Sequence, residues 1–181
     1  MSRIRIIGGV WRSRLIDVAG LPGLRPTPDR VRETLFNWLG QRLDGLACLD
    51  LFAGSGILGF EAASRGAAAV TLLDIDPRVH AALRRNAEAL SAAVEIVRGD
   101  ALKFLAATSG RFDVVFVDPP YRQGWIGRVA PLLDRTIRPD GCIYAEAEAE
   151  APLASFPGWR AIKQGRAGQV HFHLMRRAEQ S

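Results

Sequence analysis

From residue 46 onward the chain alternates short apolar runs with amphipathic stretches, and this alternation constrains the fold more than any other feature. The apolar runs cover residues 46–52, 69–76, 94–100 and 112–121, and stretches typical of helices cover 56–67, 77–90, 101–108 and 125–137. Strands that alternate with helices build a parallel sheet covered by helices on both faces. The sequence therefore predicts an α/β, Rossmann-like, doubly wound fold.

The last part of the chain follows a different pattern. Residues 141–150 begin as a fifth strand, and residues 159–177 resemble two strands around a turn at 165–168. Two strands joined by a short turn pair in antiparallel fashion. We therefore expect a mostly parallel seven-stranded sheet with an antiparallel edge strand.

The first quarter of the chain looks like an appendage to this sheet. Residues 3–18 predict a β-hairpin around Gly8 and Gly9, and a Gly- and Pro-rich loop follows at 19–28. A helix then begins, with Thr27 as the expected N-cap and Pro28 at the first helical position. The predicted division is a hairpin appendage at residues 1–26 and a catalytic domain at 27–181.

The positive charge is concentrated in that first quarter. The net charge is +5, and eight arginines against four acidic residues leave +4 before residue 45. Arginine suits phosphate groups and stacks on bases, so a nucleic-acid partner is indicated, although a solvated hairpin face is the alternative. The candidate RNA-binding residues are Arg3, Arg5, Arg12, Arg14, Arg25 and Arg32. For Thr27 and Arg32, contact with a cofactor carboxylate is an equal alternative.

A glycine loop follows the first strand of the sheet. Residues 54–59 spell GSGILG, which matches the G-x-G-x-x-G pattern of dinucleotide-binding proteins, and Asp74 lies twenty positions after Gly54. In such sheets, ligands bind beyond the carboxyl ends of the strands, and an acidic residue at that spacing binds ribose hydroxyls. On this evidence alone a nicotinamide cofactor remains an alternative.

Three acidic positions argue against a nicotinamide cofactor. Asp50 immediately precedes the loop, where a carboxylate would repel a pyrophosphate but suits an ammonium or a sulfonium. Asp100 ends the third strand and could accept a hydrogen bond from an adenine amino group. The fourth strand ends in Asp118-Pro119-Pro120-Tyr121, a tetrapeptide with no evident use in hydride transfer.

These motifs resemble the S-adenosylmethionine-dependent methyltransferases that modify exocyclic amino groups of bases. Over nearly the whole chain the sequence is similar to the RsmD family of bacterial 16S rRNA guanine-N2 methyltransferases. The resemblance is carried by RIIGGVWRSRLI, RPTPDRVRETLFNWL, DLFAGSGILGFEAASRGA, FDVVFVDPPY, GCIYAE and GQVHFHLMRR. It departs from the family at Asp74, where the family usually carries Glu.

The resemblance implies a class I methyltransferase fold and assigns roles to the motif residues. Asp118 and the Pro119 carbonyl would accept the amino N–H groups of an unpaired guanine, while Pro120 keeps the loop rigid and Tyr121 stacks on the base. The cofactor contacts expected for S-adenosylmethionine are Asp50, Phe52, Ala53, Gly54, Ser55, Gly56, Asp74, Ile75, Asp100, Ala101, Asp118 and Thr27. No metal is expected.

The resemblance also sets the expected partner and compartment. The substrate would be 16S rRNA within a partly or fully assembled small ribosomal subunit, and the enzyme would be a cytoplasmic monomer that does not contact a membrane. A DNA or other RNA adenine-N6 methyltransferase is the main alternative, since it shares the tetrapeptide. A nicotinamide oxidoreductase and a non-catalytic RNA-binding module are weaker ones. Cys48 and Cys142 lie in apolar runs and are expected to be buried, reduced thiols.

Overall fold

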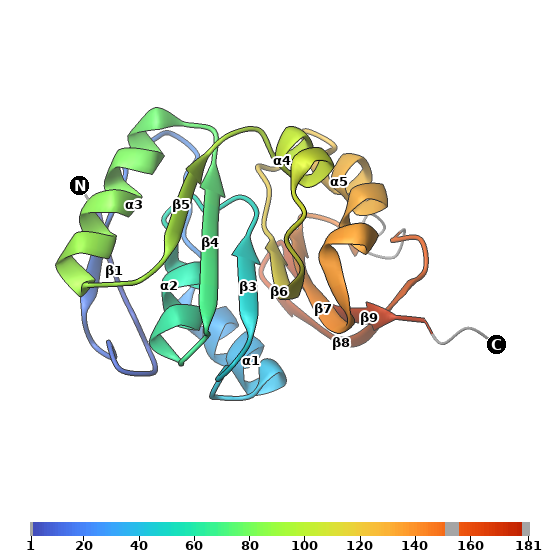
Figure 1. The fold of residues 1–181 in the computed structure, drawn as a ribbon, viewed down its shortest axis with the longest axis horizontal. Coiled ribbons are helices and arrows are strands. Elements are labelled where there is room, and N and C mark those ends of the chain that lie inside the picture. Colours follow the sequence, from blue (N-terminus) through green and yellow to red (C-terminus); the bar gives the residue numbers. More distant parts are fainter. Residues whose placement is uncertain (1, 151–155, 179–181) are drawn as a thin grey trace.

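The computed structural model describes residues 2–150 and 156–178, and it contains one large sheet, one small hairpin and five α-helices in that part of the chain (Figure 1). The strands of the large sheet are β3 (Ala47–Asp50), β4 (Ala69–Asp74), β5 (Glu95–Arg98), β6 (Phe112–Val117), β7 (Ile137–Ala147), β8 (Trp159–Ala167) and β9 (Val170–Arg177). The helices are α1 (Asp29–Leu39), α2 (Ile57–Ser64), α3 (Pro77–Leu90), α4 (Ala101–Ala107) and α5 (Trp125–Leu133), which a short 3-10 helix, η1 (Asp134–Thr136), continues.

The large sheet has seven strands in the order β5-β4-β3-β6-β7-β9-β8, which confirms the doubly wound prediction. Strands β3 to β7 pair in parallel, whereas β9 is antiparallel to both of its neighbours, β7 and β8. The antiparallel strand therefore lies one place in from the edge, which β8 occupies. The final turn is also shorter than predicted, because β8 continues through Ala167 and only Gly168 and Gln169 separate it from β9.

Helices cover both faces of the sheet, each over its own apolar core. On one face, α1, α2 and α3 contribute Leu35, Phe60 and Leu83 to a core that includes Phe116 of β6. On the other face, α4 and α5 contribute residues such as Leu105 and Val129. Alternate residues of each strand thus enter different cores, as expected for a sheet that is buried on both sides.

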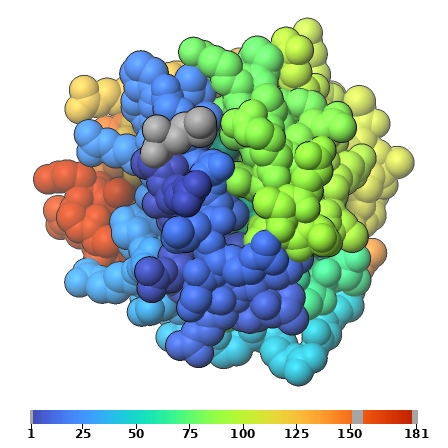
Figure 2. Space-filling view, turned by 90° about the vertical axis from the view of Figure 1, so that its left-hand side faces the viewer, coloured from blue at the N-terminus to red at the C-terminus, as the bar shows by residue number. Residues whose placement is uncertain are grey.

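The N-terminal hairpin consists of β1 (Ser2–Arg5) and β2 (Leu15–Val18), which pair in antiparallel fashion. Figure 2 shows the N-terminal segment (blue) lying against α3 (green), and Asn86 of α3 exchanges two hydrogen bonds with the backbone of Asp17. Ile6 and Ile16 belong to the same apolar core as the helices. The hairpin forms a separate sheet, but it shares its core with the helix-covered sheet.

The start of α1 differs from the prediction at Thr27 and at Arg32. Pro28, not Thr27, occupies the N-cap position, and no side chain caps the helix. Arg32 is fully buried: it donates hydrogen bonds to the backbone oxygens of Thr27 and Arg5 and forms ion pairs with Glu61 and Asp29. The prediction that Arg32 contacts RNA or a cofactor is therefore wrong, because this guanidinium is enclosed within the protein.

Two further expectations concern the thiols and the membrane. Cys48 and Cys142 are both buried and unpaired, as expected, and burial raises the pKa of Cys142 to about 12. Such thiols remain protonated and unreactive. Within residues 2–150 and 156–178, the structure contains no helix with the length and apolarity needed to cross a bilayer.

Candidate active site

Three loops that carry predicted motifs meet at the carboxyl edge of the sheet. The register pairs Asp50 of β3 with Leu72 of β4 on one side and with Phe116 of β6 on the other. The strands run in parallel, so the segments that follow Asp50, Asp74 and Val117 emerge side by side. The structure thereby gathers the glycine loop, the acidic end of β4 and the DPPY segment into one region.

The glycine loop is held by the two acidic residues that border it. One carboxylate oxygen of Asp74 accepts a hydrogen bond from the Gly54 amide at 3.0 Å, and the other accepts one from the Asp76 amide at 2.9 Å. The Asp50 carboxylate accepts a hydrogen bond from the Gly59 amide at 3.1 Å. Both acids therefore shape the loop in the protein alone, before any ligand contact is considered.

Two glycines of the loop are required by close packing. Gly56 has φ +78°, and a Cβ placed there would lie 2.4 Å from a methyl carbon of Leu83. A Cβ at Gly59 would lie 2.0 Å from a methyl carbon of Leu72. The spacing of the glycines thus reflects helix α2 packing closely against α3 and the sheet, one of the functions of this motif in dinucleotide-binding folds.

Asp118, which is half-buried, belongs to a hydrogen-bonded cluster that sequence reasoning only partly anticipated. The hydroxyl oxygen of Thr27 lies 3.4 Å from a carboxylate oxygen of Asp118 and 3.2 Å from one of Glu146. The Tyr144 hydroxyl donates to the same Glu146 oxygen at 2.7 Å. Glu146 and Tyr144 were not predicted, although a glutamate inside the apolar run GCIYAEA is a signal that could have identified Glu146.

Burial and mutual repulsion raise the pKa values of these carboxyl groups. Removal from water raises the pKa of Asp50 to about 7, an effect that the Gly59 amide partly opposes. Burial, followed by the charges of Glu146 and Asp50, raises the pKa of Asp118 well above its usual range. Burial likewise raises the pKa of Glu146. Three neighbouring carboxyl groups with raised pKa values form a site that favours a positively charged ligand.

The remainder of the DPPY segment is arranged for access from solvent. Pro119 is buried, Pro120 is exposed, and the Tyr121 side chain is 41% exposed at the edge of the site. Arg25 lies close enough to lower the pKa of Tyr121, although burial of the hydroxyl raises that pKa overall. The arrangement thus leaves one aromatic face open beside Asp118, with an arginine from the N-terminal segment nearby.

The outer contacts expected for the cofactor take two different forms. Asp100 is the N-cap of α4 and accepts a hydrogen bond from the Lys103 amide at 3.0 Å, while Ala101 is buried behind it. Ile75 is 64% exposed directly after Asp74 and places an apolar side chain at the same edge. The half-buried Phe52 packs against Trp125, with ring centroids 5.3 Å apart.

The remaining candidate arginines belong to the N-terminal hairpin, which is distant in sequence from the acidic cluster. Arg5 and Arg12 are exposed. Arg3 forms an exposed ion pair with Asp17 at 3.0 Å, and Arg14 donates to the backbone oxygen of Ala89 at 2.6 Å. These four side chains remain candidates for RNA contact.

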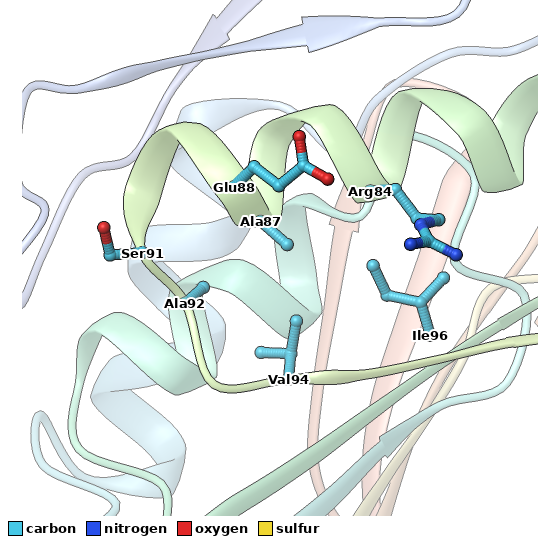
Figure 3. Close-up of a pocket in the computed structure, with 7 residues that line it drawn as sticks. All are labelled: Arg84, Ala87, Glu88, Ser91, Ala92, Val94 and Ile96. Atoms are coloured by element: carbon cyan, nitrogen blue, oxygen red, sulfur yellow. The ribbon is translucent and has the colours of Figure 1, made fainter.

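A surface hollow lies away from this site. It has a volume of about 390 Å³ and is bounded by the C-terminal half of α3 and the beginning of β5 (Figure 3). The residues that line it are Arg84, Ala87, Glu88, Ser91, Ala92, Val94 and Ile96. It lies toward the opposite end of the strands from Asp118 and contains none of the predicted motif residues.

Comparisons with known proteins show which proteins the chain resembles as a whole. Residues 4–176 match the family model described as Conserved hypothetical protein 95. The chain is 44% identical to ribosomal RNA small subunit methyltransferase D of Escherichia coli strain K12, over 99% of this chain and 92% of that protein. It is 42% identical to the protein of the same name from Haemophilus influenzae, over 96% and 93% of the two chains. A solved structure described as a putative methyltransferase from Escherichia coli superposes with a TM-score of 0.87, at 44% identity, and covers 99% of this chain and 100% of that one.

Proposed function

Because the chain belongs to the family described as Conserved hypothetical protein 95, the RsmD family, we propose that it transfers a methyl group from S-adenosylmethionine to the exocyclic N2 of a specific guanine in 16S rRNA. The names of the relatives support methylation of small-subunit ribosomal RNA. The choice of guanine N2 rests on the resemblance of the motifs and on the chemistry of the site.

One observation carries the proposal: the DPPY carboxylate of Asp118 lies in the same buried acidic cluster as Asp50, beside a glycine loop. A pyrophosphate would be repelled by Asp50, Asp118 and Glu146, whereas a sulfonium or ammonium group would be attracted. This group of carboxylates therefore fits S-adenosylmethionine and argues against a nicotinamide cofactor.

The residues that would hold this cofactor follow from their positions. Asp50 and the loop 53–56 would face its charged amino acid portion, Asp74 its ribose, and Ile75 and Asp100 its adenine. Phe52, Ala101 and Thr27 would form the surrounding wall. When bound, S-adenosylmethionine supplies a methyl group that is already activated by its positively charged sulfur.

The chain's own groups would prepare the guanine amino nitrogen, which is a weak nucleophile because its lone pair is delocalised into the ring. Asp118 and the Pro119 carbonyl would accept its two N–H groups and hold the nitrogen in a more tetrahedral geometry. Pro119 and Pro120 fix the backbone that presents these acceptors. Tyr121 would stack on the base, a contact worth about 1–3 kcal/mol. Alignment and fixed dipoles would then supply most of the rate enhancement.

The hairpin at residues 1–26 is proposed to face the RNA, through Arg3, Arg5, Arg12, Arg14 and Arg25. Its docking on α3 and α2 places these arginines on a rigid support. We propose that the enzyme acts in the cytoplasm as a monomer, on rRNA already shaped by ribosomal proteins.

The test is transfer of radiolabelled methyl from S-adenosylmethionine to small subunits from a strain that lacks this enzyme. Label should enter 16S rRNA with the wild type and not with Asp118→Asn, which keeps the size of the side chain but replaces one acceptor oxygen with a donor. Asp134→Asn is the matched control, since Asp134 is exposed and pairs with Arg177 far along the chain. Label in duplex DNA and none in rRNA would overturn the proposal.

A further inference from the structure

Glu146 occupies a position that none of the motifs assigns. The register of β6 and β7 places Val117 opposite Ala145, so Asp118 and Glu146 follow side by side as the next residues of the two strands. Glu146 is 3% exposed, although it is a carboxylate at the end of a strand. A buried acid of this kind requires partners that compensate for its loss of hydration.

The two hydroxyl groups beside Glu146 do not carry enough protons to satisfy both Glu146 and Asp118 if both carboxylates are ionised. The Tyr144 hydroxyl donates its proton to Glu146, and the Thr27 hydroxyl lies between Glu146 and Asp118 at 3.2 and 3.4 Å. A hydroxyl carries a single proton, so Thr27 can fully satisfy only one of the two acids. One additional proton held between Asp118 and Glu146 would complete the network.

The charged groups around this pair favour the same arrangement. The charge of Asp50, at the end of β3, raises the pKa of Asp118, and the charge of Glu146 in turn raises the pKa of Asp50. Tyr121 and Tyr144 are neutral phenols with raised pKa values. Arg25 acts on Tyr121 at the rim, and Glu148 is engaged by Arg122 at 3.3 Å.

We propose that Glu146 is a positioning residue for the methyl transfer, which shares one proton with Asp118 and retains it when Asp118 accepts the N–H of the target amino group. This inference rests on the proposed function. Thr27 and Tyr144 would hold Glu146 in place, and Glu146 would thereby set both the orientation and the charge of Asp118. Two adjacent carboxyl groups that share one proton titrate as a pair, in two separate steps.

The proton balance of the reaction gives this pair a use. When the amino nitrogen forms its bond to the methyl carbon, the bond from that carbon to sulfur breaks and the sulfur becomes a neutral thioether. The nitrogen must then lose one proton, for which Asp118 is the nearest described acceptor in the proposed geometry. Asp118 would take that proton while Glu146 keeps the shared one, so the pair would carry two protons until one of them passes to water.

The first experiment measures kcat/KM against pH for the wild type, Glu146→Gln and Glu146→Ala. The amide of Gln is neutral, like the protonated form of Glu146, and keeps an acceptor for Tyr144 and Thr27, so activity should persist. Because Gln removes the second ionisation of the pair, the basic limb that reports loss of the shared proton should move to higher pH by about one unit or more. Ala leaves both hydroxyls buried without that partner, so its activity should fall at every pH. Glu148→Gln is the matched control, because it removes the same charge two residues away and should leave the limb in place.

An unchanged basic limb in Glu146→Gln, or an equal shift in Glu148→Gln, would overturn the inference. A second measurement requires neither substrate nor cofactor, and so separates this inference from the proposed function. Infrared spectra of protein labelled with ¹³C-aspartate should show a protonated aspartic acid at pH 8 in the wild type, which disappears in Asp118→Asn and in Glu146→Gln. If Glu146→Gln does not fold, the wild type and Asp118→Asn decide: absence of the band from the wild type overturns the proposal.

Discussion

Replacement of Arg32 by methionine tests the buried ion network that joins α1, α2 and the hairpin. Methionine keeps most of the length and the apolar character of the stem but removes the guanidinium. The change leaves Glu61 with the Arg65 side chain at 3.3 Å and the Ile7 amide at 2.5 Å as its remaining partners. It also removes the donors to the backbone oxygens of Thr27 and Arg5.

The expected cost follows from the burial of both charges. Arg32 and Glu61 have no exposed side-chain surface, and the removal of one partner of such a pair costs about 3–5 kcal/mol. Glu61 keeps two donors, so the lower end of that range, roughly 3 kcal/mol, is expected. For a chain of this size each kcal/mol lowers Tm by about 2–4 °C, so the variant should melt roughly 6–12 °C below the wild type.

Urea unfolding followed by circular dichroism measures this cost, with the slope m as a check that the folded state is equally compact. Arg30→Met is the matched control, because Arg30 is exposed on the same helix and its loss should change stability by no more than about 0.5 kcal/mol. Equal, small effects of the two substitutions would refute the network, and a loss of RNA binding by a fully stable Arg32→Met protein would restore the original prediction for Arg32.

Three further predictions follow from single positions. Because the pKa of Asp50 is about 7 in the folded protein and about 3.9 when unfolded, the folded state binds more protons between these values and its stability falls as pH rises from about 4 to 7. Asp50→Asn should therefore stabilise the protein more at pH 8 than at pH 5, by about 3 kcal/mol because about two units of the pKa shift lie above pH 5, as urea titrations at the two pH values would show. A Cβ at Gly9 would lie 1.9 Å from the Ser64 backbone oxygen, so Gly9→Ala should cost clearly more stability than Gly23→Ala, where φ is also positive but the space is open; equal costs would argue against the docked hairpin. Arg12→Ala should weaken binding to small subunits and reduce the salt dependence of log K by about one, measured by filter binding at increasing KCl, and an unchanged slope would remove Arg12 from the interface.

The sheet and its helices could be predicted from local patterns because their determinants are local. Helix α3 begins and ends where the sequence indicated, since Asp76 caps it, Pro77 fits its first turn and its apolar residues recur at helical spacing. The parallel order followed from the alternation of strands and helices. The position of β9 inside the sheet was not predictable at this level, because a hairpin alone does not determine which of its strands pairs with β7.

The candidate site was less accessible to sequence reasoning because its contacts are distant in the chain. Asp118 could be identified from its motif, but its neighbour Glu146 comes from the adjacent strand, and Thr27 reaches it across 119 residues. Arg32 was misassigned because its partner Glu61 lies 29 residues away, and a positive charge in a basic segment gives no sign of burial. Asp100 was predicted only as a cofactor contact, and the structure shows that it also caps helix α4.

The identity of the methylated nucleoside tests the central proposal most directly. Small subunits that lack the modification would be incubated with the enzyme and S-adenosylmethionine, and the 16S rRNA would be digested and analysed by mass spectrometry. The proposal predicts N2-methylguanosine at one position, absent when Asp118→Asn is used. N6-methyladenosine in its place, or no methylated nucleoside in rRNA from any small-subunit preparation, would contradict it.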